Sequence, residues 1–233
     1  MKTDKICVIV GASGEPVSKD QIVTGGKHLV IAADGGQLKL RELGIMPDVL
    51  IGDFDSFEET PVFGAGKILK YPIEKDDTDT MLAVRYGLEN GYRNFLLLSC
   101  IGGKRLDHSI ATIQTLGFIA ENGGIGIACD GRKDICGEEQ LLLAVKNSRI
   151  VFPKKMKGDL SVFSLTGRCL GVDILNLKYR ACNTELTSLF PLGVSNSFVG
   201  KSAEISVSEG VLLLYFKRCG IPFEDVFGFV EDK

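Results

Sequence analysis

Five aspartates cluster in the segments VLIGDFDS and KDDTDTM; they are Asp53, Asp55, Asp76, Asp77 and Asp79. The first two follow a short apolar run, and alternate residues of an extended segment point to the same side. Two carboxylates on one side can share Mg²⁺, which prefers oxygen ligands and often binds substrate phosphates as well. The pattern predicts a metal or phosphate site. The alternative is that these residues only end a strand and open a turn.

A further aspartate, Asp34, stands at the end of another apolar run, His28–Ala33, and is followed by two glycines. Open parallel sheets bind ligands in the crevice outside the carboxyl ends of their strands. We therefore expect Asp34 to join Asp53 and Asp55 at one edge of a parallel sheet. The alternative is that Asp34 only caps the helix that follows it.

The glycine turn GGKRLDH, residues 102–108, follows a further apolar run and carries Lys104 and Arg105. Glycine lets a phosphate approach the backbone, and a guanidinium can bind two phosphate oxygens at once. This favours Arg105 as an anion contact, whereas Lys104 is better explained as a solvated side chain. His108 is predicted to form a hydrogen bond at a helix start, with catalysis as the alternative.

Asp76 and Asp79 are three residues apart, ahead of a helix predicted over 80–90. On the first turn of a helix they would share a face and point at a common ligand. The alternative needs no ligand, because acidic residues at a helix start also satisfy free amides and the helix dipole.

Apolar runs that close on glycine or polar residues predict buried parallel strands at 5–11, 28–33, 48–53, 94–100 and 125–129. Helices are expected through 38–44, 80–90 and 109–121, with an exposed strand at 66–71. After Arg132 there is no convincing helix, and short strands are expected at 140–145, 148–152, 160–165, 202–207 and 211–217. The segment 190–198 is predicted to be an irregular polar stretch.

This order of elements predicts the α/β class. An N-terminal parallel-sheet, Rossmann-like α/β domain would occupy residues 1–138, and a C-terminal all-β sandwich domain would occupy residues 139–233.

Composition excludes several classes of function. The 233 residues are 45% hydrophobic and 24% charged with a net charge of −3, which is typical of a soluble globular protein and argues against a broad nucleic-acid interface. The small basic cluster at 154–157 is expected to be a solvated turn. No signal peptide and no apolar run near the ~20 residues of a membrane span is visible, so we expect a cytoplasmic protein. The seven cysteines contain no CxxC pair and suit a reducing compartment without a zinc site.

The motifs AADGG, GDFDS, KDDTD and GGKRLDH occur in this order at the ends of successive strands, and in this combination the chain resembles the thiamin pyrophosphokinase (thiamin diphosphokinase) family. The segments 171–179 and 193–196 resemble sandwich-domain motifs of that family. The resemblance implies transfer of pyrophosphate from ATP to thiamin, with Mg²⁺, and a homodimer whose active site lies at the subunit interface.

The same resemblance implies roles for individual residues. Asp53 and Asp55 would hold the metal, Asp55, Asp79 and Arg105 would be catalytic, and the remaining ATP and thiamin contacts would be Asp34, Asp76, Asp107, Ser195 and Asn196, with Arg105 also touching ATP. A general base is not required for such a transfer, and if one acts it would be Asp79 or Asp55.

The chain departs from the family pattern at Lys104, which is inserted after the glycines, and at Asn176, which replaces a glycine. There is no tryptophan to stack on thiamin, and Phe198, Tyr179 or Tyr215 would have to serve instead.

Two other functions remain open at this level. The run ending in Asp53-Phe54-Asp55 also resembles the nucleophile motif of haloacid-dehalogenase-type phosphatases, which would make the protein a hydrolase without ATP. That interpretation leaves Asp34 and the all-β domain unexplained. A non-catalytic nucleotide or thiamin sensor is the third possibility, although every acidic position is present.

Overall fold

The computed structural model describes residues 5–24, 26–54, 66–74, 76–218 and 220–231. Its contacts divide these residues into two compact units. The α/β unit comprises the described residues up to 115 together with 128–132, and the β-rich unit comprises 116–127 and the residues from 133 onward. The predicted domain boundary between 138 and 139 lies in the connection between β6 and β7.

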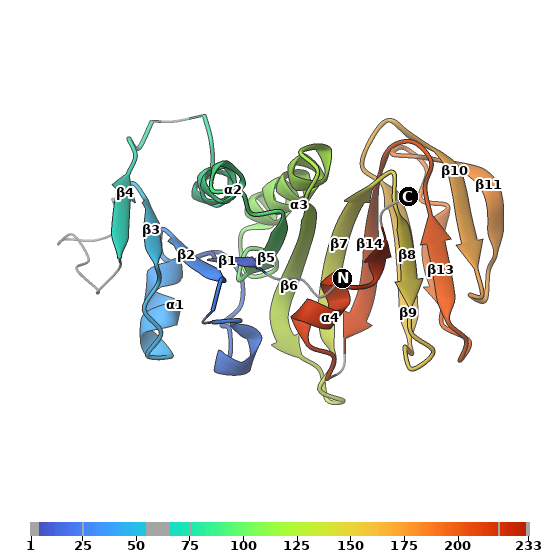
Figure 1. Cartoon of the computed structure of the whole chain (residues 1–233), viewed down its shortest axis with the longest axis horizontal. Helices are drawn as coiled ribbons and strands as arrows, with labels where there is room; N and C mark the ends of the chain where they lie inside the picture. The colour runs from blue at the N-terminus through green and yellow to red at the C-terminus, as the bar shows by residue number, and fades with distance from the viewer. Residues whose placement is uncertain (1–4, 25, 55–65, 75, 219, 232–233) are drawn as a thin grey trace. The chain divides into compact units, whose positions relative to one another are not determined.

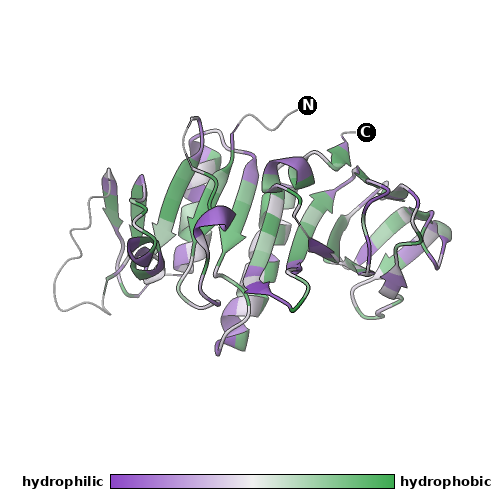
Figure 2. Ribbon diagram, turned by 90° about the horizontal axis from the view of Figure 1, so that it is seen from below, coloured by the Kyte–Doolittle hydropathy of each residue, from purple (hydrophilic) through white to green (hydrophobic). Residues whose placement is uncertain are grey.

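The α/β unit is built on a parallel sheet, as its apolar runs predict. Its strands are β1 (Cys7–Val10), β2 (Leu29–Ala33), β3 (Val49–Gly52), β4 (Lys67–Lys70) and β5 (Asn94–Leu98), paired in parallel in the order β5-β1-β2-β3-β4, with β6 (Ile125–Lys133) next to β5. The strands β1, β2, β3 and β5 are almost wholly buried, whereas β4 is mostly exposed, and apolar residues run along the buried strands (Figure 2). The carboxyl ends of β1, β2, β3 and β5 therefore lie at one edge.

The helices follow the strands in alternation. They are the short η1 (Lys19–Gln21), α1 (Gly36–Glu42), α2 (Asp79–Glu89) and α3 (Leu106–Glu121). Figure 1 shows α1 and α2 on opposite faces of the parallel sheet, as right-handed crossovers require when the chain reverses its direction across the sheet. No helix of the described segments is long and apolar enough to cross a membrane.

Three details of the predicted helices are corrected. α3 begins at Leu106 and not near Ser109, so Asp107 lies in its first turn, where an acidic side chain complements the helix dipole. Asp76 precedes α2 and cannot share a helical face with Asp79. α1 spans Gly36–Glu42, so it begins and ends two residues before the predicted 38–44.

The β-rich unit contains two antiparallel sets of strands and one short helix. Its elements are β7 (Glu139–Lys146), β8 (Arg149–Phe152), β9 (Asp159–Ser164), β10 (Arg168–Leu175), β11 (Ala181–Thr187), β12 (Gly193–Ser197), β13 (Ala203–Ser206), β14 (Val211–Arg218), α4 (Phe223–Phe227) and β15 (Val230–Glu231). One set runs β7-β14-β9-β12 and the other β11-β10-β13-β8-β15. Phe152 packs edge-on against Phe216 between them, with 5.1 Å between ring centroids.

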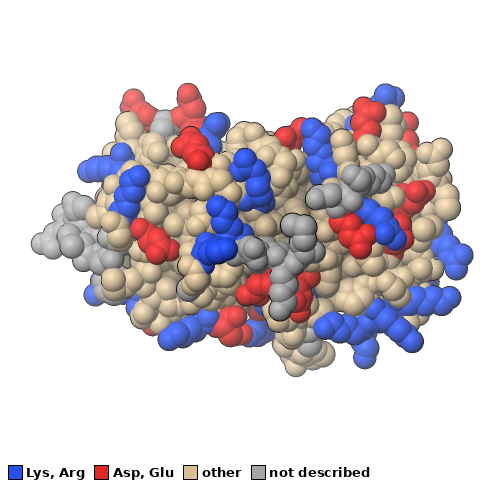
Figure 3. Space-filling view, viewed as in Figure 1, with Lys and Arg blue, Asp and Glu red and all other residues tan. Residues whose placement is uncertain are grey.

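Two predictions for this unit were wrong. α4 is a helix where none was expected, and the stretch at 190–198 contains the strand β12. The lysines at 154, 155 and 157 are exposed in the turn between β8 and β9, as expected. On the face drawn in Figure 3, basic and acidic side chains are interspersed over the α/β unit.

One ion pair of the β-rich unit is buried. Arg218 on β14 and Glu139 on β7 are cross-strand partners, 8% and 2% exposed, and the guanidinium of Arg218 donates to the carboxylate of Glu139. The same guanidinium donates to the carbonyl of Ile221 and packs over the ring of Phe223, 3.8 Å from its centroid. The pair therefore connects the central strands to the segment that carries α4.

Candidate functional site

The structure brings Asp34 and Asp53 together at neighbouring strand ends of the α/β unit. Asp34 directly follows β2 and its amide donates to the carbonyl of Ile51 on β3 (2.7 Å). A Cβ added to Gly52 would lie 3.1 Å from the Cα of Asp34, so the residue before Asp53 touches the backbone of Asp34. Both aspartates are half-buried. The prediction of one shared edge is therefore confirmed for the positions of Asp34 and Asp53.

Backbone strain marks the same edge. Asp34 (φ 45°), Phe54 (φ 59°) and Ser99 (φ 55°) are non-glycine residues in the left-handed region, and each follows a strand of the parallel sheet. Such conformations are costly outside glycine and gather at functional sites. The φ value of Phe54 also corrects the prediction that Asp53 and Asp55 leave β3 on one continuous extended segment. Asp55 itself lies outside the described residues.

The start of α2 is a capped helix end. Thr78 caps it by accepting from the amide of Met81 (3.2 Å), and Asp79 is the first helical residue and half-buried. Asp77 binds the guanidinium of Arg85 (2.9 Å), whereas Asp76 is exposed. Thr78 therefore caps the helix and Asp79 lies where it complements the helix dipole, as the interpretation without a ligand requires, while ligand binding by Asp79 stays a prediction.

The turn after β5 carries a preformed pair of opposite charges. Gly102 (φ 77°) and Gly103 (φ 67°) are both left-handed, and the amide of Gly102 donates to the hydroxyl of Ser109 (3.1 Å). Arg105 then binds Asp107 through two parallel hydrogen bonds of 2.9 and 2.6 Å. Both side chains are exposed, so the guanidinium keeps donors available to a phosphate.

The Arg105 pair gives a testable effect on ionisation. The hydrogen bonds from Arg105 lower the pKa of Asp107 to about 2. The pair is therefore complete above the ordinary aspartate range and is lost only as the pH falls through about 2. In Arg105→Gln we expect the pKa of Asp107 to return toward about 3.9. Carboxyl-carbon NMR titration of both proteins measures this. An unchanged value would mean that the amide of His108, which also stabilises the carboxylate, dominates.

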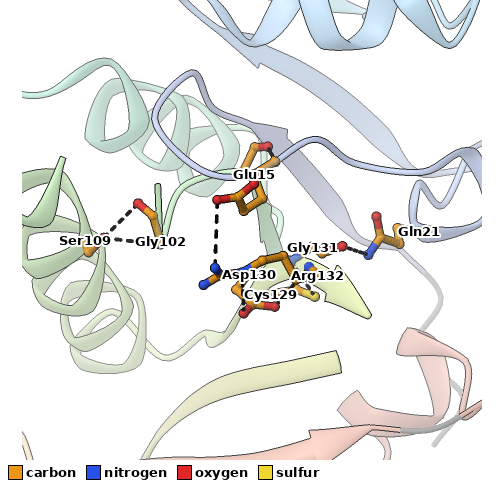
Figure 4. A network of polar contacts seen from close by, with 9 residues as sticks. Glu15, Gln21, Gly102, Ser109, Cys129, Asp130, Gly131 and Arg132 are labelled. Atoms are coloured by element: carbon orange, nitrogen blue, oxygen red, sulfur yellow. Dashed lines mark hydrogen bonds and ion pairs between the residues drawn. The ribbon is translucent and has the colours of Figure 1, made fainter. Parts of the chain in front are cut away.

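Sequence reasoning missed a polar network at the end of β6, drawn in Figure 4. Arg132 lies between Glu15 (3.9 Å) and Asp130 (3.6 Å), and Gln21 donates to the carbonyl of Gly131 (3.3 Å). These residues come from two segments more than 100 positions apart in the chain, so no single motif predicts the network. The network fixes the loop after β1 to the end of β6.

In the β-rich unit, Asn196 is buried and holds the backbone of Tyr179. Its side chain accepts from the amide of Tyr179 (2.9 Å) and donates to the carbonyl of the same residue (2.6 Å). Both residues line a pocket of about 390 Å³, together with Arg180 and Cys182. Ser195 is exposed with a left-handed backbone (φ 60°), and its amide donates to the hydroxyl of Ser161 (3.1 Å). The predicted residues Ser195 and Asn196 are thus adjacent, but Asn196 lines the pocket and Ser195 does not.

The three aromatic candidates differ in their surroundings. The ring of Phe198 packs edge-on against Phe152, with 5.3 Å between centroids, and Tyr215 is half-buried on the central strand β14. Tyr179 is 59% exposed beside the pocket. Among the three, Tyr179 presents the most accessible ring.

The donors at the edge of the parallel sheet fit a magnesium ion. Of the two predicted metal ligands, Asp53 lies at this edge beside Asp34 and offers hard carboxylate oxygens, the ligand type that Mg²⁺ prefers. Within the described part of the chain no group of three His, Cys, Asp or Glu side chains is arranged to hold a metal. Water and substrate oxygens would complete the coordination, as is usual for this ion.

Comparisons with known proteins match two successive parts of the chain. The family model "Thiamin pyrophosphokinase, catalytic domain" matches residues 22–127, and "Thiamin pyrophosphokinase, vitamin B1 binding domain" matches residues 147–212, so that together they span well over half of the chain. A curated relative, thiamine pyrophosphokinase of Bacillus subtilis, is 28% identical over 200 residues, which are 80% of this chain and 86% of the relative.

Solved structures agree in fold. The crystal structure of thiamine pyrophosphokinase from Bacillus subtilis covers 92% of this chain and 99% of its own, at 21% identity and a TM-score of 0.72. The yeast thiamin pyrophosphokinase structure covers 92% of this chain and 87% of its own, at 15% identity and a TM-score of 0.67. Both share the mixed α/β fold with an antiparallel β-rich part.

Proposed function

Because the chain belongs to the thiamin pyrophosphokinase family, we propose that it transfers the pyrophosphoryl group of ATP to the hydroxyl of thiamin, giving thiamin diphosphate and AMP. The observation that carries the proposal is the adjacency of Asp34 and Asp53, with a strained backbone at Asp34, at the carboxyl edge of the parallel sheet. This is where such sheets bind ligands.

In the proposed reaction, the thiamin oxygen forms a bond to the β-phosphorus of ATP as the bond from that phosphorus to the oxygen bridging it to the α-phosphate breaks. The hydroxyl proton leaves to solvent or to a carboxylate, Asp79 or Asp55, and AMP departs with the bridging oxygen. Positioning and charge stabilisation provide most of the rate enhancement in transfers of this kind.

The predicted site residues would have different roles in this reaction. Asp53 and Asp55 would hold Mg²⁺, and the ion, when bound, neutralises the charge of the triphosphate. Arg105 would stabilise the charge that develops on the transferred group, with Asp107 fixing its orientation through the two observed hydrogen bonds. Asp34 and Asp76 would bind nucleotide or thiamin.

The β-rich unit would bind thiamin through Ser195 and Asn196. We propose further that this unit is a β-sandwich and the α/β unit a Rossmann-like domain, in a cytoplasmic homodimer with the active site at the subunit interface. Exposed apolar side chains in the β-rich unit support an interface there; they are Leu189, Phe190, Leu192 and Val194.

Tyr179 is proposed to replace the missing tryptophan. Its ring is exposed and its backbone is held by Asn196, so the ring can stack on the pyrimidine or face the cationic thiazolium of thiamin. Tyr179→Ala is expected to raise KM for thiamin about tenfold, with little change in KM for ATP. Steady-state kinetics measures both constants. Tyr215→Ala is the matched comparison, and a larger effect there than at Tyr179 would reassign the stacking surface.

The function itself is tested by incubating purified protein with ATP, MgCl₂ and thiamin and separating nucleotides and thiamin esters by chromatography. AMP and thiamin diphosphate should form in equal amounts and should disappear when EDTA removes the metal. Release of phosphate without thiamin diphosphate would instead support the phosphatase interpretation of Asp53. Thiamin binding without turnover would support the sensor interpretation.

A further inference from the structure

Lys39 joins two loops of the α/β unit. It lies on α1 and is half-buried. Its ammonium donates to the carbonyl oxygens of Ala12 (3.0 Å) and Gly14 (2.6 Å) and to the hydroxyl of Ser99 (2.8 Å). A lysine ammonium has three N–H donors, so all three are engaged within the protein. Lys39 therefore acts on the loops and does not offer a free donor to a ligand.

Ser99 extends this contact between the loops after β1 and β5. Its hydroxyl accepts from Lys39 and donates to the carbonyl of Glu15, and its own carbonyl accepts from the amide of Gly14 (2.7 Å). A Cβ on Gly14 would lie 2.5 Å from the carbonyl carbon of Ser99, so only glycine permits this approach. Gly14 therefore serves the packing of the two loops.

The contact between the two loops depends on the protonated form of Lys39, because only the ammonium has three N–H donors. Burial lowers the pKa of its ammonium, while nearby groups, among them Glu15 and Glu42, raise it. The three acceptors replace the water that the ammonium loses on burial, and an apolar side chain in its place would leave them without this donor.

The two loops lie at the point where the chain changes direction across the sheet. β1 stands between β2 and β5, and the chain continues through β2, β3 and β4 on one side before it returns to β5 on the other. Ligands of open parallel sheets bind at such switch points. The loop after β5 leads directly into the turn that carries Arg105, and α1 begins just after Asp34.

We propose that Lys39 is a positioning residue for nucleotide binding: by holding the loop after β5 against the loop after β1, it fixes the turn that carries Arg105. The inference rests on the function proposed above for that turn. Lys39 lies outside the predicted set of site residues, because in the sequence it is one more polar residue on an amphipathic helix.

The first test is Lys39→Met, which removes the ammonium and keeps an unbranched side chain. KM for ATP is expected to rise about tenfold and KM for thiamin to change less than about twofold, because a displaced loop affects the group that it carries. Amide hydrogen exchange should accelerate in the segments 11–15 and 99–105. Lys39→Arg should recover only part of the loss, since a planar guanidinium cannot direct three donors from one nitrogen.

Ser99→Ala is a second variant, which removes one of the three acceptors of Lys39 and the donor to the carbonyl of Glu15, and leaves the two carbonyls that accept from Lys39. It should raise KM for ATP in the same direction by a smaller factor, and the double variant should show less than the product of the two effects, because both remove the same hydrogen bond. Arg41→Met, an exposed position on the same helix, is the control and should leave KM for ATP unchanged.

A folded Lys39→Met protein with unchanged KM for ATP would overturn the proposal, as would an equal rise in both KM values. If Lys39→Met does not fold, unchanged KM and unchanged exchange in Ser99→Ala overturn it. If the wild-type protein makes no thiamin diphosphate, the proposed function is wrong. The positioning role of Lys39 is then tested by measuring equilibrium binding of ATP to the wild type and the variants. Weaker ATP binding by the variants than by the wild type would then support the positioning role, and equal binding would reject it.

Discussion

Replacement of Asp53 by asparagine is expected to lower kcat for thiamin diphosphate formation by about a thousandfold. The substitution keeps the size and polarity of the side chain and removes one negative charge beside Asp34, at the strand ends that we assign to Mg²⁺. Since metal and substrate charge must be compensated in the transition state, the loss should appear in turnover more than in stability. Steady-state kinetics at saturating ATP, thiamin and MgCl₂ measures it, and raised MgCl₂ should recover only part of the activity.

Asp48 provides the matched control. It lies just before the opposite end of the same strand, β3, and its carboxylate accepts from the amide of Val30 (2.8 Å). Asp48→Asn retains an acceptor for that amide and should leave kcat unchanged. Full activity of Asp53→Asn would reject the assignment of the metal site. Equal losses in both variants would show that the effect comes from the strand and not from its carboxyl end.

Removal of the buried carboxylate in Glu139→Ala is expected to lower the free energy of unfolding by about 3 to 5 kcal/mol. Arg218 would then keep a buried charge without its cross-strand partner, between β14 and the segment carrying α4. Urea denaturation followed by circular dichroism measures the change. If the single variant is too unstable to purify, the double variant Glu139→Leu with Arg218→Met, which removes both charges, should restore folding because no buried charge is left.

The exposed pair of Arg168 and Glu185, 3.8 Å apart, is the control for this prediction. Glu185→Ala should change the free energy of unfolding by about 1 kcal/mol or less, because solvent screens both charges. A loss in Glu139→Ala no larger than that in Glu185→Ala would contradict the assigned role of the buried pair.

The parallel sheet could be predicted because its strands contain unbroken apolar runs, such as CVIV in β1 and FLLL in β5, which are typical of a sheet covered on both faces. The positions of Asp34 and Asp53 follow from the same reasoning, because parallel strands place their carboxyl ends at one edge. These parts of the site depend on local pattern alone.

Other features of the fold and of the site depend on contacts between segments distant in the sequence, and no local sequence pattern predicts them. β11 has mostly exposed or half-exposed residues with a register irregularity against β10, so its sequence lacks a clean alternation. The bonds of Lys39 to Ala12, Gly14 and Ser99 join residues 25 to 60 positions apart. The start of α3 at Leu106 was missed because the glycine turn before it has no conventional capping residue.

The left-handed backbone of Asp34 means that thermal stability and catalysis favour different residues at this position. Glycine would adopt that conformation without steric cost, so a search for heat-resistant variants alone would favour it at this position. The same exchange would delete a carboxylate that we propose to bind nucleotide or thiamin. Substitutions meant to raise thermal stability without loss of activity should therefore spare Asp34. They are better placed in the β-rich unit, away from Tyr179 and Asn196.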